Sequence, residues 1–524
     1  MSQVEPELLV EEPGKRKLES SRLLARNTAL NLATECWLAV VLFANIPLLV
    51  KFLGEESFGL FSLAWVVVGY LAFLDIGVST ATTKFTSEYL AKRESDQVSR
   101  LVRTALATNS IMGLVAGALA IAIAPFLIQH AFKIPAPLHS QALHVFLAVA
   151  FALPVLLTQG VLRATFSSFQ RFDFINIVNG STITVQWLLM TFLAWKGFGV
   201  VIVVWVAVLA RVAMVISYLI LLRRVVPDVF HHLSFCWQTL WRLLHFGAWV
   251  SVSQVMSPVL VYFDRMMIAA MVSLSAVTVY TVPTEVFNRL GILPSCLMAT
   301  LFPALSHHGA TGGANGQLSR LYAFTSRYLL FVFFPLFAFL TVNARDIFTV
   351  WMGSGFASQG TLVLQILAAG AFVNFLARLP FGAVQALGRP DVTGKFHLLE
   401  LPIYIALCVL MISRWGITGA ALACTMRLWL DSALLFWAAH RYCHLGFARL
   451  SDISRILLTV ILFILCMLGI QIALHNLWQR VVFSTSLLLV DYMTIWYFVV
   501  SRTDKPAILR AMGLAQQTSQ LTTS

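Results

Sequence analysis

Charged residues are scarce in this sequence. Of its 524 residues, 11% are charged and 59% are hydrophobic, whereas a soluble protein carries about 25% charged residues. The segments between its apolar runs are short and leave no room for a soluble catalytic domain. This composition predicts an integral membrane protein and argues against a soluble enzyme.

Motifs of common catalytic and metal sites are also missing. The sequence contains no G-x-x-x-x-G-K-[ST] loop for ATP and no H-E-x-x-H pair for zinc. Its seven cysteines are scattered without C-x-x-C spacing, a pattern typical of free packing cysteines and not of disulfides or metal ligands. We therefore expect no enzyme activity, no cofactor and no bound metal.

Apolar runs occupy most of the chain. A helix needs about 20 mostly apolar residues to cross the hydrocarbon core of a bilayer. Fourteen runs approach this length: 28–50, 57–80, 103–129, 141–166, 174–195, 198–222, 241–263, 276–304, 323–343, 360–386, 396–413, 416–439, 455–475 and 480–501. They predict an all-α polytopic membrane protein with about 14 transmembrane helices.

The chain is basic, with 36 Lys and Arg against 23 Asp and Glu. In a membrane protein, basic residues gather in cytoplasmic loops, so this excess indicates orientation and not nucleic-acid binding. Every predicted inside segment carries more basic residues than any predicted outside loop. The outside loops carry one each: Lys51, Lys133, Lys196, Arg265, Arg345, Arg414 and Arg480. This alternation places both termini in the cytoplasm.

A weak internal repeat divides the chain. An R-x-D tripeptide follows the fourth run at Arg171 and the tenth run at Arg389, and the same offset aligns the first run with the seventh. The repeat predicts two six-helix lobes with a substrate site between them near mid-membrane. The predicted parts are a cytoplasmic N-terminal arm (1–26), an N-lobe (27–222), a C-lobe (223–440), two additional helices (441–501) and a cytoplasmic C-terminal tail (502–524).

An acid, Asp75, lies inside the second apolar run. On a continuous helix, Ser79 and Thr82 or Thr83 would share its face, at steps of three or four residues. A carboxylate is costly in hydrocarbon, so this face is expected to meet water or protein. With the N-terminus inside, Asp75 lies in the inner half of its helix. There it either gates or couples transport, or it anchors the first helix through Asn27 or Asn31.

Further polar residues interrupt other apolar runs: Asn27, Asn31, Glu35, Arg163, Arg211, Glu285, Arg289, Asn374, Arg378, Arg427 and Asp431. Neither Arg211 nor Arg378 has a sequence neighbour that could pair with it. An unpaired guanidinium at depth must face a cavity, an acid of another helix or an anionic ligand. The third, fifth, ninth, eleventh and thirteenth runs are expected to be almost free of charge and to face lipid around a polar cavity.

Some of these groups also have structural interpretations. Glu285 with Arg289, and Arg427 with Asp431, are opposite charges four residues apart that could neutralise each other on one helix. Arg163 could instead extend to the inner membrane surface. The polar stripe of the first helix could form hydrogen bonds between packed helices.

An ordered set of short segments resembles a known family. The first half contains R-x-x-x-x-N-x-x-x-N ending at Asn31, F-L-G-E-E-S-F-G-L-F at 52–61 and L-D-I-G-V at 74–78. The second half contains F-D-R-M-M-I-A-A at 263–270 and L-F-P-A-L-S at 301–306. Together they resemble the polysaccharide flippases of the bacterial MOP superfamily, the Wzx-type translocases of O-antigen and exopolysaccharide units.

This resemblance implies two lobes around a V-shaped cavity in the bacterial inner membrane, together with two C-terminal helices. It implies translocation of an undecaprenyl-pyrophosphate-linked oligosaccharide from the cytoplasmic to the periplasmic leaflet. Membrane lipids, a polysaccharide polymerase and chain-length proteins are the implied partners. The alternatives are a lipid II-type flippase, a cation-coupled small-molecule exporter of the MATE type and a membrane glycan enzyme.

Candidate site residues follow from the expected substrate. Arginine forks bind pyrophosphate well, and buried carboxylates can carry protons across a membrane. The expected binding residues are Arg163, Arg211, Arg289, Arg378, Arg427 and Asn374. The expected coupling or gating residues are Glu35, Asp75, Glu285 and Asp431.

Overall fold

The computed structural model describes residues 13–75, 77–226, 229, 236–295, 298, 317–386, 389–443 and 450–499. Every regular element within these residues is a helix, which confirms the predicted all-α fold. Eight helical segments of this part are long and apolar enough to cross a membrane. The chain is therefore membrane-embedded, and the count of fourteen spans stays a prediction. The tail at 502–524 lies outside the described residues.

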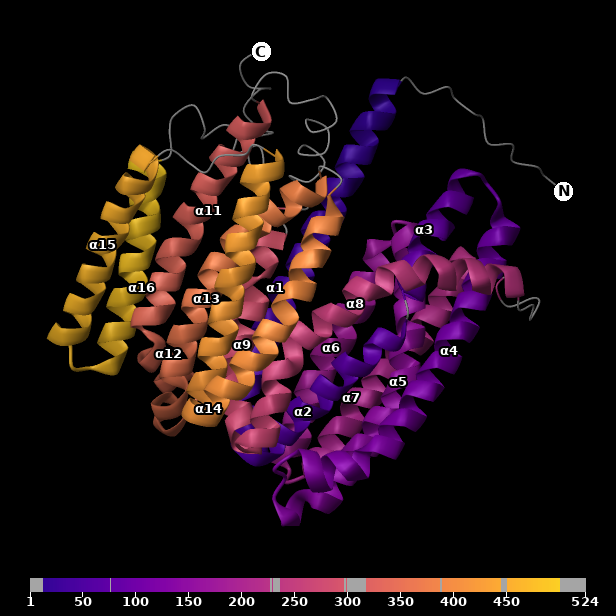
Figure 1. The fold of residues 1–524 in the computed structure, drawn as a ribbon, viewed down its shortest axis with the longest axis horizontal. Coiled ribbons are helices and arrows are strands. Elements are labelled where there is room, and N and C mark those ends of the chain that lie inside the picture. The colour runs from indigo at the N-terminus through magenta and orange to yellow at the C-terminus, as the bar shows by residue number, and fades with distance from the viewer. Residues whose placement is uncertain are drawn as a thin grey trace. The chain divides into compact units, whose positions relative to one another are not determined.

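The helices pack as two compact units (Figure 1). The first unit contains α1 (Pro13–Leu53), α2 (Glu55–Leu71), η1 (Ala72–Asp75), α3 (Val78–Ala91), α4 (Ser95–Phe126), η2 (Leu127–Ala131), η3 (Ala136–Leu138), α5 (His139–Ser168), α6 (Phe172–Trp195), α7 (Val200–Val225), α8 (Trp237–Met271), α9 (Leu274–Leu290) and residues Leu401–Ala420. The second unit contains α11 (Gln317–Val342), α12 (Ala344–Trp351), α13 (Ser354–Ala386), the rest of α14 (Pro390–Cys443), α15 (Leu450–Ala473), α16 (Leu477–Thr494) and η5 (Ile495–Val499).

Small residues bring α4 and α5 together, and the two helices lie side by side in Figure 1. A Cβ atom added to Gly113 would lie 2.2 Å from the Cα atom of Pro154, and one added to Gly117 would lie 2.6 Å from the carbonyl oxygen of Ala150. Helices pack in membranes through such small-residue faces, because hydrocarbon provides no hydrophobic force between them. The two helices therefore approach each other closely at these glycines.

The second predicted span is not a continuous helix. It breaks into α2, the 3-10 turn η1 and α3. Gly77 precedes α3 with a φ of 66°, a left-handed backbone conformation that glycine adopts without steric cost. The prediction of one continuous helix through Asp75 is therefore wrong, because the backbone turns there.

The eleventh and twelfth predicted spans both lie in α14, where two helices meet at a kink. Its helical geometry is interrupted at Gly416, where φ is 56° and ψ is −131°. This break falls at the first residue of the predicted span 416–439, three residues after the span 396–413 ends. The short helix α12 was not expected from the apolar pattern, because its eight residues include Arg345 and Asp346.

Candidate functional site

Asp75 accepts hydrogen bonds from residues of the first unit. Its carboxylate accepts hydrogen bonds from the backbone N–H of Ser79 at 3.3 Å, from the Ser79 hydroxyl at 2.9 Å and from the side-chain amide of Asn109 on α4. Asn109 also donates to the carbonyl oxygen of Leu157 on α5, at 3.0 Å. Asp75 thus ties the start of α3 to α4 and α5. The suggested anchoring of Asp75 to Asn31 is not seen among the described residues, where Asn31 pairs with Asn176. The side chain of Asn27, the other suggested partner, lies outside the described residues, and a coupling role for Asp75 stays a prediction.

A polar pocket of about 240 Å³ lies in the first unit. Its lining residues come from α1, α5 and the start of α6: Asn31, Thr34, Glu35, Arg163, Ser167, Phe172, Ile175, Asn176 and Asn179. The Asn176 amide donates to the Asn31 carbonyl oxygen at 2.6 Å. The structure therefore brings two predicted site residues of α1, Asn31 and Glu35, together with Arg163 of α5, which is distant from them in the sequence.

Glu285 and Arg289 are not paired with each other. Arg289 Nη1 lies 3.7 Å from Glu35 Oε2 on α1, and Glu285 Oε1 lies 3.6 Å from Arg265 Nη2 on α8. Asn288 also donates to Glu285, at 3.2 Å. The structure thus differs from the local pairing that the four-residue spacing allows, because each charge meets an opposite charge on another helix.

Arg265 is a site residue that the sequence reasoning placed elsewhere. It was expected in an outside loop, but it lies within α8 and is only 4% exposed. Its neighbour Asp264 is 3% exposed and accepts a hydrogen bond from the hydroxyl of Tyr280 on α9. The expectation failed because the preceding apolar run ends near residue 263, whereas the helix continues to Met271.

Arg211 lies on α7 among apolar side chains. Its guanidinium lies 5.7 Å from the Trp65 ring centroid, and its Nη1 contacts the Met214 sulfur at 3.9 Å. Among the described residues, its Nε is buried without a hydrogen-bond partner. A buried donor without an acceptor costs about 1–3 kcal/mol, so an anionic ligand would gain by binding it.

A second polar cluster lies on α13 and α14, within the second unit. Asn374 donates to Asp431 at 3.1 Å. The charges of Asp431 and Arg427 both act on Arg378. The structure thus brings together all four predicted site residues of this unit, Asn374, Arg378, Arg427 and Asp431. Arg378 on α13 has no neighbour in sequence that could pair with it. The negative charge that acts on it is that of Asp431 on α14.

Sequence reasoning missed two members of this cluster, Glu400 and His397. Glu400 is fully buried, and its charge interacts with those of Asp431 and Arg427. His397 interacts with Arg378 as well as with these two residues. Both lie in the run 396–413, so the expectation that the eleventh run is almost free of charge was wrong. The signal was an acid within an apolar run, the same signal that identified Asp75.

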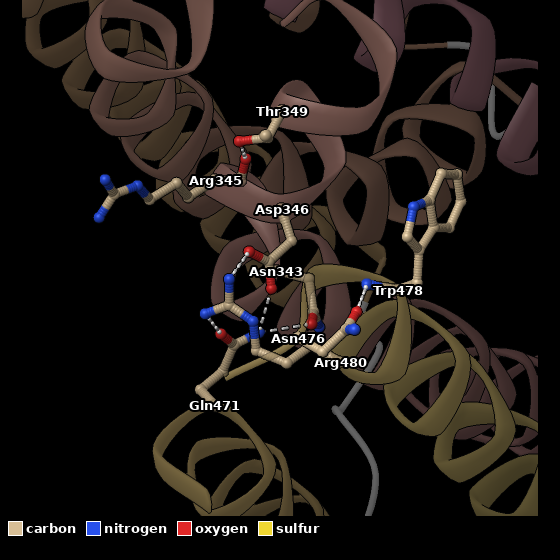
Figure 2. Close-up of polar contacts among 8 residues, drawn as sticks. All are labelled: Asn343, Arg345, Asp346, Thr349, Gln471, Asn476, Trp478 and Arg480. Carbon is tan, nitrogen blue, oxygen red and sulfur yellow. Dashed lines mark hydrogen bonds and ion pairs between the residues drawn. The ribbon is translucent and has the colours of Figure 1, made fainter. Parts of the chain in front are cut away.

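A third polar network attaches α15 and α16 to the second unit (Figure 2). Asp346 on α12 is 2% exposed and accepts from Arg480 of α16 at 3.0 Å and from Gln471 of α15 at 2.8 Å. Gln471 also donates to Asn343 at 2.9 Å and accepts from Arg480 at 3.1 Å. The network holds the two C-terminal helices in place.

Comparison with known proteins supports the sequence resemblance. Residues 24–308 match the family model described as polysaccharide biosynthesis protein. A Shigella flexneri protein assigned as an O-antigen transporter is 27% identical over 431 residues, which cover 80% of this chain and 98% of that protein. An uncharacterized membrane protein of Methanocaldococcus jannaschii is 25% identical over 181 residues, 34% of this chain and 35% of that protein.

Solved structures share the fold. An inward-facing multidrug-resistance MATE transporter of the MOP superfamily superposes with a TM-score of 0.66 at 14% identity, covering 80% of this chain and 98% of its own. The lipid II flippase MurJ in an inward closed conformation gives 0.64 at 12% identity, covering 91% of this chain and 98% of its own. At these identities the likeness concerns the fold alone. Because the family model matches more than half of the sequence, the chain belongs to the polysaccharide biosynthesis protein family.

Proposed function

We propose that this protein translocates undecaprenyl-pyrophosphate-linked oligosaccharide units across the inner membrane, for assembly of a surface polysaccharide such as O-antigen or exopolysaccharide. Membership of the family and the relation to the Shigella flexneri protein support this class of cargo. It acts as a transporter and not as an enzyme.

The observation that carries the proposal is the gathering of arginines with amide and acidic groups inside apolar helices. In the second unit, Arg378 and Arg427 lie with Asn374 and Asp431 on α13 and α14. A pyrophosphate carries about two negative charges, and guanidinium forks bind such groups in a fixed geometry. An exporter of organic cations would instead require an excess of acids at its binding site.

Each site residue receives a role in this proposal. The pyrophosphate and the saccharide are bound by Arg163, Arg211, Arg289, Arg378, Arg427 and Asn374. Coupling or gating is performed by Glu35, Asp75, Glu285 and Asp431, assisted in unit 1 by Asn27 and Asn31. The chain has no ATP-binding loop, so directional cycling uses an ion or proton gradient, for which buried carboxylates are the usual carriers.

The protein functions with both termini in the cytoplasm and with two six-helix lobes that alternate access to a central cavity. The excess of Lys and Arg in alternate loops supports this orientation. Both R-x-D loops form the same internal ion pair, Arg171 to Asp173 at 2.9 Å and Arg389 to Asp391 at 3.3 Å, which supports the repeat. Membrane lipids, a polymerase and chain-length proteins are its proposed partners.

A lipid II-type flippase is the second candidate. The similarity to MurJ covers 91% of this chain, whereas the similarity to the MATE transporter covers 80%. That likeness concerns the fold, however, whereas the family match points to surface polysaccharide. The two candidates differ in the saccharide and share the prenyl pyrophosphate.

Deletion of the gene in its own host tests the function. We expect loss of the surface polysaccharide and accumulation of prenyl-linked oligosaccharide on the cytoplasmic side. Arg378→Gln and Arg211→Gln should each fail to restore export, because glutamine keeps much of the length and removes the charge. Arg345→Gln is the matched control, since the Arg345 side chain points away from its neighbours in Figure 2.

Protein amount in the membrane is measured by immunoblot for each variant. Normal surface polysaccharide and an unchanged lipid-linked pool in the deletion strain would overturn the proposed function. Full export by both arginine variants would keep the function and remove these two residues from the binding site.

A further inference from the structure

The pocket between α1, α5 and α6 has the chemistry of a carbohydrate subsite. Its lining includes the amides Asn31, Asn176 and Asn179 and the hydroxyls of Thr34 and Ser167. Amides and hydroxyls both donate and accept hydrogen bonds, as the ring hydroxyls of a sugar require. A lining of this kind is unusual between helices of a chain in which 59% of residues are hydrophobic.

Part of this lining is fixed before any ligand binds. The Tyr218 hydroxyl donates to the side-chain amide oxygen of Asn179 at 3.1 Å, and Tyr218 is itself fully buried on α7. The hydrogen bond between Asn176 and Asn31 joins α6 to α1. These contacts orient the amides and reduce the conformational entropy that their side chains would lose when a ligand binds.

The surroundings of the pocket are positively charged. Arg163 lines it, and the charge of Arg211 acts on Arg163 from α7. Glu35, the one acid of the lining, lies 3.7 Å from Arg289. Three arginines against one glutamate favour a ligand that carries negative charge beside its hydroxyls.

The size of the pocket limits what it holds. Sites for drug-sized ligands occupy roughly 300–1,000 Å³, whereas this pocket measures about 240 Å³. It accommodates one ring and not an oligosaccharide. Phe172 and Ile175 add an apolar wall, against which the C–H face of a sugar ring can pack.

We propose that this pocket binds the single sugar residue attached to the pyrophosphate, with the phosphate oxygens directed toward Arg163. This inference rests on the proposed function and assigns the first sugar of the cargo to the first unit. In the proposed orientation, the predicted spans 28–50 and 174–195 both begin at the cytoplasmic side, and the pocket residues of α1 and α6 lie near these starts. The subsite would therefore engage the cargo on the side from which it enters.

Binding of two probes to the purified protein in detergent tests this assignment. The probes are a short-chain prenyl pyrophosphate and the same compound with one attached hexose. We expect the hexose to tighten binding about tenfold, the effect of one or two additional net hydrogen bonds. Asn179→Leu should abolish this gain and leave the affinity for the bare pyrophosphate within about twofold, because it removes the amide and keeps Arg163.

Ser167→Ala is a milder variant that keeps the assignment testable if Asn179→Leu does not fold. It should reduce the hexose gain about threefold. Ser181→Ala is its matched control: Ser181 lies outside the pocket lining, and its hydroxyl donates to the Ile177 carbonyl oxygen at 2.6 Å. The control should bind both probes as the wild type does.

Equal affinity of the wild type for both probes would overturn the sugar subsite while leaving the proposed function intact. The same would follow if Asn179→Leu weakened both probes equally, since the pocket would then bind phosphate. Failure of the wild type to bind either probe would contradict the proposed function and, with it, this inference.

Discussion

Glu400 is fully buried on α14. The residues that follow it, 401–413, are all apolar except Tyr404 and Ser413. The Glu400 carboxyl group lies within hydrogen-bonding reach of Asp431 and near the charge of Arg427. A buried ionisable group is kept in a membrane protein mainly where it moves ions or binds cargo. Together with Asp431, it makes the α13–α14 cluster a candidate for coupling as well as for binding.

Replacement of Glu400 by glutamine should separate coupling from folding. Glu400→Gln keeps the shape of the side chain and removes the ionisable group, so we expect gradient-driven transport to fall about tenfold. Transport is measured in proteoliposomes with and without an imposed pH gradient. Glu56→Gln, an exposed acid at the start of α2, is the control. Full gradient-driven transport by Glu400→Gln would contradict a coupling role.

The helices α15 and α16 are attached to the rest of the second unit partly through polar contacts with α12. Two side chains of this pair bind the same carboxylate of α12, that of Asp346 (Figure 2). Arg480 of α16 forms a buried ion pair with it, and the Gln471 amide of α15 donates a hydrogen bond to it. Because Asp346 is buried in protein, water would not readily replace a missing partner there. The attachment therefore combines this polar network with apolar packing, in which Phe463 and Met467 of α15 pack with Phe331 of α11.

Removal of one partner should loosen this attachment. Arg480→Gln leaves Asp346 as a buried acid without its cation, a change that typically costs about 3–5 kcal/mol. We expect a lower melting temperature in detergent and earlier proteolysis of α15–α16. Asp346→Asn combined with Arg480→Gln should recover part of the loss, whereas Arg345→Gln, on the exposed face of α12, should melt as the wild type does. An unchanged melting temperature in Arg480→Gln would show that apolar packing suffices.

At the scale of the whole molecule, orientation can be read from two neighbouring loops. The loop at Gln170 is predicted to be inside and the loop at Gly197 outside, because Lys and Arg favour the cytoplasmic side. Alkaline phosphatase fused after Gly197 should be active, and the same enzyme fused after Gln170 should be inactive, with activity normalised to protein amount. The reverse pattern would overturn the proposed topology and reverse the direction of export.

The fold class and the family could be predicted from sequence because apolar runs and short motifs are local signals. The residues of the polar cluster on α13 and α14 were partly predictable, since Asn374, Arg378, Arg427 and Asp431 all interrupt apolar runs. Their partners were not, because contacts such as Glu35 to Arg289 join residues more than 250 positions apart. Arg265 was misplaced because an apolar run does not mark where a helix ends once charges are buried inside protein.

The break at η1 has a consequence for how the chain enters the membrane. At 1.5 Å per residue, the 17 residues of α2 span about 25 Å, less than the ~30 Å of hydrocarbon. In the predicted topology, the crossing is completed by η1 and α3, whose start depends on Asn109 of α4 and, through it, on α5. During synthesis, α3 therefore reaches its final position only after α4 and α5 have been made, so the N-terminal helices do not settle in the order in which they emerge.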